Sequence, residues 1–359
     1  MRHRRGLSAI AAVGLLGVLA ACSSSSSAGS SAGGSASGNA VTNVVLGYSN
    51  ANIINWATVR MAYDSSYCAP YGVKVTPEVL NPTSAVAAIE SGQVNFIATG
   101  SVVTAVAKGT VHNEKLVAYL GLNAPDEVAG LWASPGINSA KDLIGKTIGA
   151  SSPTSPTYLG AVALLQHEGI SASQVHFVFL SSESAVLAAL AHGTISATWN
   201  NGPLPAANTA AKDHIAVPLT DDPGLDSVDS QFLTGNQSFM TQHPAAAKGF
   251  LECLAAATKG GRSTDAATLN TYQTLLAKQT GDATLSKETW PEYPIAAGVM
   301  PMDSTSEKVL SQSLTLQLGK TVSASDVASW ADTTPMTGVT AVPIVNSAGT
   351  SQYAAYSGK

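Results

Sequence analysis

The sequence has few charged residues, few aromatic residues and no basic run beyond its first five positions. Charged residues make up 11% of the chain, aromatic residues make up 6%, and the formal net charge is −5. A nucleic-acid-binding protein carries a basic patch or stripe that attracts phosphate groups, and none is present here. The composition therefore argues against nucleic acid as a partner.

Motifs of common catalytic sites are also missing. No G-x-S-x-G elbow, glycine-rich phosphate loop or Cys–His site is evident. The histidines do not have the spacing of metal ligands. We therefore expect no catalytic residue, no bound metal and no cofactor. The seven histidines lie at positions 3, 112, 167, 176, 192, 214 and 243.

Long hydrophobic runs are absent apart from one near the start, which extends from Leu7 to Ala20. Three arginines precede this run, and Leu19-Ala20-Ala21-Cys22 follows, which is typical of a secretory signal peptide. A cysteine directly after small residues resembles the bacterial lipobox, which implies cleavage before Cys22 and a lipid on its thiol. The alternatives are an ordinary signal peptide or a single anchoring helix, but the run is shorter than the ~20 residues that a span needs. We expect a protein anchored by lipid to the outer face of the cell membrane, exported by the Sec or the Tat route.

The segment after Cys22 is almost entirely Ser, Gly and Ala as far as Gly38. Such a composition cannot bury a core and is typical of a flexible tether. The rest of the chain is long enough for two domains.

Strands alternate with helices over most of the remaining sequence, which predicts parallel sheets covered on both faces. A second series of strands and helices begins near Ser139, and helices dominate from Asp221 onward. Capping boxes are expected at Ser139, Ser304 and Ser323. The predicted strands are 44–48, 74–80, 94–98, 116–122 and 130–133 in the first series, and 147–150, 175–180, 195–199 and 215–219 in the second.

Four segments carry a resemblance to a known family. They are the strand Val45–Tyr48, the stretch Ala88–Phe96 with Gly100-Ser101, the stretch Lys141–Gly149, and Gln242-His243-Pro244 before a long helix. Their order resembles the type II periplasmic solute-binding proteins of ABC importers, in the branch serving nitrate, alkanesulfonates, taurine and thiamine-pyrimidine precursors. The likeness covers roughly residues 41–330. The family often has an acidic or aromatic pair where this chain has Asn200-Asn201. The resemblance therefore does not identify the ligand.

The resemblance implies an α/β, two-lobed type II periplasmic-binding-protein fold, in which each lobe is a mostly parallel sheet flanked by helices. Two crossings, near Ala133–Asn138 and Leu219–Gly224, would join the lobes. The expected organisation is a signal peptide at 1–21, a tether at 22–40, lobe one at 41–135 and 222–345, lobe two at 136–221, and a tail at 346–359.

The resemblance also bears on the cysteines that remain after Cys22. Taken alone, Cys68 and Cys253 fit either one disulfide or two buried free thiols. The family places the helix that begins at Pro244 back in lobe one, where Cys68 ends the first helix. The resemblance therefore implies a Cys68–Cys253 disulfide.

The ligand site is expected where strands lead into helices, because ligands of open parallel sheets bind beyond the carboxyl ends of the strands. Four such loops are Ser49–Asn55, Thr99–Ser101, Ser151–Ser155 and Ser181–Ser182. Free N–H groups of helix starts bind anions, and hydroxyl and amide side chains add neutral partners. Trp199 is placed equally well in the core or at the ligand. The expected ligand-binding residues are Asn50, Asn52, Asn55, Gly100, Ser101, Ser151, Ser152, Thr154, Ser155, Thr157, Trp199 and Asn200.

None of these loops contains Lys or Arg. This favours a small monoanion such as a sulfonate, or a neutral polar heterocycle, over a doubly charged ligand. The function implied by the resemblance is the substrate-binding component of an ABC importer, a monomer that delivers its ligand to a membrane permease. A ligand-sensing surface lipoprotein is the alternative, and an enzyme acting on a pyrimidine-like compound is a further one.

Overall fold

The computed structural model describes residues 41–48, 68–98, 100–122, 129–153, 155–201, 204–219, 230–261 and 297–343, with a few positions between 265 and 274. These ranges belong to one compact unit, Ala40–Lys359. The predictions for the signal peptide, for Cys22 and for the tether lie outside the described residues.

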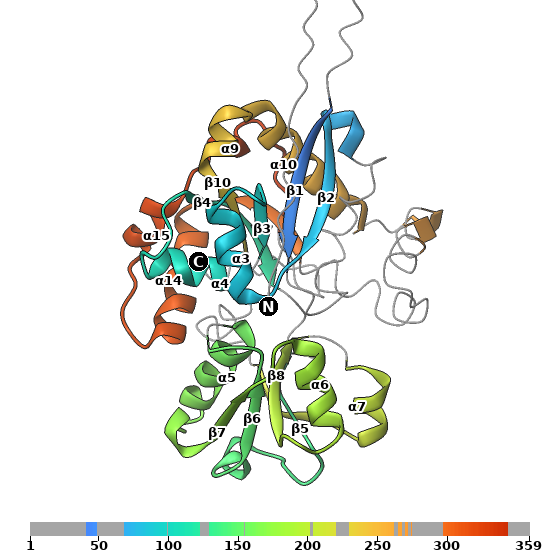
Figure 1. Ribbon diagram of the computed structural model, residues 1–359, viewed down its shortest axis with the longest axis vertical. Coiled ribbons are helices and arrows are strands. Elements are labelled where there is room, and N and C mark those ends of the chain that lie inside the picture. The colour runs from blue at the N-terminus through green and yellow to red at the C-terminus, as the bar shows by residue number, and fades with distance from the viewer. Residues whose placement is uncertain are drawn as a thin grey trace, which may run out of the picture. The chain divides into compact units, whose positions relative to one another are not determined.

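Two mixed sheets flanked by helices form this unit (Figure 1), which confirms the predicted α/β class. The first sheet has six strands in the order β11-β4-β10-β3-β1-β2. Its strands are β1 (Thr42–Tyr48), β2 (Val73–Val79), β3 (Phe96–Ala98), β4 (Glu114–Leu122), β10 (Ser230–Asn236) and β11 (Ala297–Pro301).

The second sheet has five strands in the order β7-β6-β8-β5-β9. β5 pairs with both β8 and β9, so the chain changes sheet between β4 and β5, ahead of the crossing predicted at Ala133–Asn138. The return to the first sheet falls between β9 and β10, which includes the second predicted crossing. The strands are β5 (Ala129–Ala133), β6 (Thr147–Ala150), β7 (His176–Phe179), β8 (Ala197–Asn201) and β9 (His214–Pro218).

The sheets are mixed and not mostly parallel. β1 runs parallel to β2 and β3, whereas β10 is antiparallel to both β3 and β4. In the second sheet, β6 is parallel to β7 and β8, but β5 is antiparallel to β8 and β9. The antiparallel strands β5 and β10 are the first that the chain forms after each change of sheet.

Helices dominate the described residues after Asp221, as predicted, but two strands that the sequence did not predict, β10 and β11, also lie there. β10 has only two large apolar residues, Phe232 and Leu233, and so lacks a clear strand pattern. Its pairing with neighbours on both sides makes it a central strand, and Leu233 is fully buried. Tertiary context decides strand formation here, as it often does.

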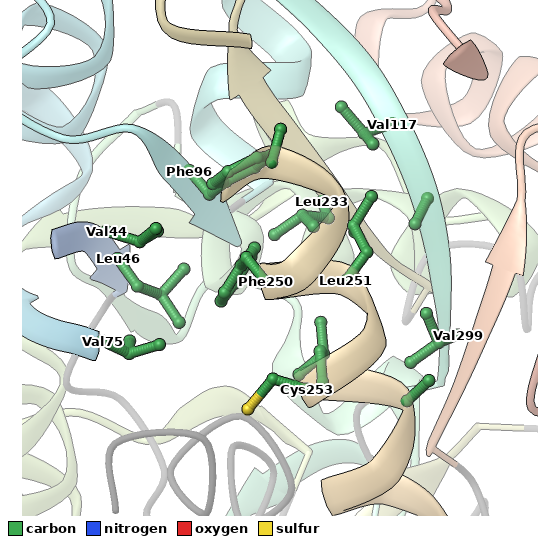
Figure 2. Packing of buried hydrophobic residues seen from close by; sticks show 14 of the residues in the cluster. Val44, Leu46, Val75, Phe96, Val117, Leu233, Phe250, Leu251, Cys253 and Val299 are labelled. Carbon is green, nitrogen blue, oxygen red and sulfur yellow. The ribbon is translucent and has the colours of Figure 1, made fainter. Parts of the chain in front are cut away.

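The largest core lies between the first sheet and helix α10 (Pro244–Gly261), as Figure 2 shows. Phe250 stacks against Phe96 of β3 with ring centroids 4.6 Å apart. A side chain at Gly249 would collide with the carbonyl oxygen of Tyr71, so this glycine allows α10 to approach the segment that follows Cys68. Cys253 of the same helix forms a disulfide with Cys68, with Cα atoms 5.0 Å apart, as the sequence analysis predicts.

Side-chain caps hold the helix starts at several positions. The Asn81 side chain accepts a hydrogen bond from the Ser84 N–H at 2.9 Å, and Ser182 accepts one from Ala185 at 3.1 Å. Ser323 forms a complete capping box with Asp326. The helices involved are α3 (Pro82–Glu90), α6 (Glu183–Ala191) and α15 (Ala324–Trp330).

Two of the three predicted capping boxes are wrong. The hydroxyl of Ser139 donates to the Asp142 carboxylate at 2.9 Å and does not cap the short 3-10 helix Ala140–Leu143. Asp303 takes the place predicted for Ser304, because its carboxylate accepts from the N–H groups of two residues in the first turn of α14 (Ser304–Leu318). An ionised carboxylate is a stronger acceptor than a hydroxyl, which favours Asp303 as the cap.

The remaining helices complete the layers on the two sheets. Across the described ranges, no helix combines the length and the apolar character that a membrane span needs. The helices not yet named are α4 (Gly100–Ala107), α5 (Pro156–His167), α7 (Ala206–Ala211), α9 (Gln237–Gln242), and the 3-10 helices Ala69–Tyr71, Ala172–Gln174 and Thr334–Met336.

Candidate functional site

The candidate site in the first sheet lies at the carboxyl ends of β1 and β3, which are parallel neighbours. α4 begins at Gly100, two residues after the end of β3, as the sequence predicts. The structure describes the backbone of Gly100 and Ser101 and places both in the first turn of this helix. The expected ligand residues Asn50, Asn52 and Asn55 fall outside the described residues.

In the second sheet, the chain leaves β6 through residues 151–155 and enters α5. Ser155 caps the helix, because its hydroxyl oxygen accepts from the Tyr158 N–H at 3.2 Å. The same hydroxyl donates to the carbonyl oxygen of Ser152 at 2.8 Å and lies 2.8 Å from the hydroxyl of Thr157. The loop and the first turn of the helix therefore share one hydrogen-bond network.

Thr157 extends this network back to the end of β6. Its hydroxyl oxygen accepts from the Ser151 N–H at 3.3 Å and lies 3.5 Å from the Ser151 hydroxyl. Ser155 and Thr157 are buried, whereas Ser151 and Ser152 are partly exposed. The buried pair holds the shape of the loop, and Ser151 and Ser152 lie at its partly exposed side. Thr154, also expected at the site, is outside the described residues.

Trp199 belongs to the core of the second sheet. It is 3% exposed and packs against Gly160 of α5, where an added Cβ would lie 2.7 Å from the indole ring. Asn200 follows it in β8, pairs with Gly130 of β5 and is 1% exposed. Both residues are therefore buried within the second sheet, near the carboxyl end of β8.

A carboxyl group that the sequence analysis did not single out lies at the start of α6. Glu183 follows the cap Ser182, and burial raises the pKa of Glu183 to about 7. Its position directly after a strand and a serine cap was visible in the sequence.

No group of three or more His, Cys, Asp and Glu side chains suitable for a metal ion occurs within the described ranges. Cys68 and Cys253 are joined to each other, so neither thiol is free to act as a nucleophile. The chemistry that the described loops offer is hydrogen bonding from hydroxyls and helix N–H groups.

Comparison with solved structures defines the fold class. The alkanesulfonate-binding protein SsuA from Xanthomonas axonopodis pv. citri, bound to MOPS, has a TM-score of 0.64 at 14% identity, covering 82% of this chain and 99% of that one. The aliphatic sulphonate binding protein SsuA from Escherichia coli has a TM-score of 0.63 at 16% identity, covering 81% and 97%. DSZB in complex with biphenyl-2-sulfinic acid has a TM-score of 0.56 at 15% identity, covering 83% and 99%. These likenesses show a periplasmic-binding-protein fold.

The family follows from the sequence itself. The family model described as "NMT1/THI5 like" matches residues 54–261, more than half of the chain. The chain therefore belongs to the NMT1/THI5-like family. No curated protein matches this sequence.

Proposed function

We propose that this protein is the extracytoplasmic substrate-binding component of an ABC importer. It captures a small polar or anionic solute between two lobes and delivers it to a membrane permease. The sequence predicts lobe one at residues 41–135 and 222–345 and lobe two at residues 136–221. Because β5 belongs to the second sheet, we move the first boundary to the stretch between Leu122 and Ala129.

The observation that carries this proposal is the set of hydrogen bonds among the described residues between β6 and α5. These hydrogen bonds fix a helix start at the carboxyl end of a parallel strand, where α/β folds bind ligands. The free N–H groups of such a turn bind anions without a cationic side chain. Membership of the NMT1/THI5-like family and the fold shared with sulfonate-binding proteins support the same function.

The leader sequence supports an extracytoplasmic location. Cleavage before Cys22 would leave a lipidated N-terminus, and the Ser/Gly-rich stretch that follows would tether the binding unit to the outer face of the membrane. In this arrangement a monomer is sufficient, because both halves of the ligand site come from one chain.

The ligand chemistry follows from the loops. They contain hydroxyl and amide groups but no Lys or Arg, and Glu183 adds an acid at one helix start. A sulfonate, nitrate or a pyrimidine-like heterocycle fits these groups.

An enzymatic role has less support. DSZB, a desulfurization enzyme, shares the fold, so the fold alone does not decide between the two functions. A cysteine nucleophile would need a free thiol, and the two cysteines after Cys22 are held in a disulfide.

Isothermal titration with taurine, ethanesulfonate, nitrate and a 4-aminopyrimidine tests the proposal. We expect at least one of them to bind with a micromolar or tighter Kd and to be recovered unchanged. Thr157→Leu should weaken that binding by more than tenfold, about 1.4 kcal/mol, because it disrupts the loop that holds the helix start. Ser304→Leu, at an exposed position away from this loop, is the matched control and should bind normally. Failure of all four compounds to bind would refute the proposal.

A further inference from the structure

β4 contains a bulge at Gly121. This residue pairs with Gln231 of β10 on one side and with Ala297 of β11 on the other, and both neighbouring registers shift before the next pair, at Tyr119. Gly121 has a φ of 98°, which few residues other than glycine adopt. Bulges redirect side chains and are frequent next to active sites. The residues beside this bulge are therefore candidates for a role in ligand binding.

The bulge lies at the carboxyl edge of the first sheet. The last residue of β3, Ala98, pairs with Leu233 of β10. β10 runs antiparallel to β3, so Gln231 lies two positions beyond the end of β3. β1 and β3 end at this same edge, where the ligand loops of the first lobe are expected.

Gln231 has a polar atom that is not satisfied within the described structure. Its side chain is partly buried, and its amide oxygen is buried without a hydrogen-bond partner among the described residues. Buried polar groups are paired in the great majority of native proteins, so an orphan at this edge points to a partner supplied from outside.

Thr234 provides a contrast in the same strand. Its hydroxyl is also buried without a partner among the described residues, but it pairs with Ile97 and Leu116 inside the sheet and is fully enclosed. Side chains alternate between the two faces of a strand, so Thr234, three positions after Gln231, lies on the opposite face of the sheet. The Thr234 hydroxyl is therefore enclosed within the sheet, whereas Gln231 lies at the carboxyl edge.

We infer that Gln231, placed by the Gly121 bulge, binds the solute through its side-chain amide, and that the solute carries an N–H or O–H donor beside its acidic or polar group. The inference rests on the proposed binding function and narrows its ligand class. A solute such as an aminosulfonate or an aminopyrimidine meets the requirement, and nitrate does not.

The test uses Gln231→Leu, with Thr234→Val as the matched control, and two pairs of probes that differ by one amino group. The pairs are taurine with ethanesulfonate, and a 4-aminopyrimidine with the same pyrimidine lacking the amino group. We expect Gln231→Leu to bind the donor-bearing probe about tenfold more weakly and its partner within about twofold of the unchanged protein. Thr234→Val should bind all probes normally.

Thermal melting without ligand separates a binding role from a structural one. Loss of an amide that serves only the ligand should leave the melting temperature equal or higher, because a buried unpaired group is removed. A melting temperature several degrees lower, unchanged binding of the donor-bearing probe, or binding of nitrate alone would each overturn the inference while leaving the binding function intact. If the unchanged protein binds neither nitrate nor any of the probes, the proposed function fails and the inference fails with it.

Discussion

At the scale of single residues, the serines and threonines of the β6–α5 loop divide into two groups. The hydroxyls of Ser155 and Thr157 are consumed by bonds within the loop, whereas Ser151 and Ser152 remain partly exposed. Residue type alone does not separate these groups, because each hydroxyl can cap a helix or contact a ligand equally well. Only the backbone path decides which of them turns inward.

Two glutamates form a coupled pair between α3 and β4. Glu90 accepts hydrogen bonds from the N–H groups of His112 and Asn113 at 3.1 and 3.3 Å. The pKa of Glu90 is lowered, chiefly by its interaction with the neighbouring Glu114 side chain. Burial and the neighbouring Glu90 carboxylate raise the pKa of Glu114 to about 8. Near neutral pH, Glu114 therefore keeps its proton while Glu90 is ionised.

This pair predicts a loss of stability with rising pH. The pKa of Glu114 is higher in the folded protein than its ordinary value of 4.5, so its contribution is complete below that pH and is lost as the pH rises to about 8. The free energy of unfolding should fall by at most about 1.4 kcal/mol per pH unit in this window. Glu90 has the opposite shift and acts only below its ordinary pKa.

Urea denaturation at pH 5, 6.5 and 8 measures the effect, with Glu114→Gln as the comparison. We expect the variant to lose the part of the pH dependence that Glu114 contributes, because a glutamine cannot ionise, and to keep the part below about pH 7 that comes from the raised pKa of Glu183. Parallel profiles for the two proteins would show that Glu114 does not hold its proton.

At the scale of elements, α14 depends on Asp303 for its start. The carboxylate accepts from the N–H groups of Thr305 and Ser306, both at 3.0 Å, and the Ser306 hydroxyl accepts from the Asp303 N–H at 2.7 Å. Asp303→Ala should lower the free energy of unfolding by about 1 kcal/mol. Ser304→Ala, one position later and exposed, should change it by only a few tenths. Equal losses of unfolding free energy for the two variants in urea denaturation would indicate that Ser304 caps the helix.

The sequence predicted most elements because their boundaries carry local signals. The strand Thr42–Tyr48 contains the apolar run Val44-Val45-Leu46, and α5 is bounded by Ser155 and Gly169, whose φ is 75°. β10 could not be predicted in this way, because its central place comes from pairing with strands more than 100 positions earlier in the chain. The same reason hid Gln231, which becomes notable only opposite the bulge at Gly121.

At the scale of the whole molecule, the Cys68–Cys253 disulfide connects the segment before β2 to α10. The two cysteines are 185 positions apart, and the loop between them contains the entire second sheet. The resemblance to the family implied this bridge, whereas composition alone left free thiols open. The bridge therefore constrains the first sheet and its helices without entering the second.

Removal of the bridge should lower stability without changing ligand affinity. The chain-entropy estimate for so long a loop is about 5 kcal/mol, although measured gains are often smaller. A Cys68→Ser, Cys253→Ser double variant should unfold at a lower urea concentration than the oxidised protein and match the protein treated with reductant. Identical unfolding of all three would show that the bridge does not stabilise the fold.

The central claim is that this protein binds a small solute and releases it chemically unchanged. Native mass spectrometry of the purified protein, before and after incubation with the four titration probes, tests the claim most directly. We predict one non-covalent adduct per chain, with the mass of a single small solute that is recovered intact on denaturation. Absence of any adduct, or recovery of a product with a different mass, would contradict the claim.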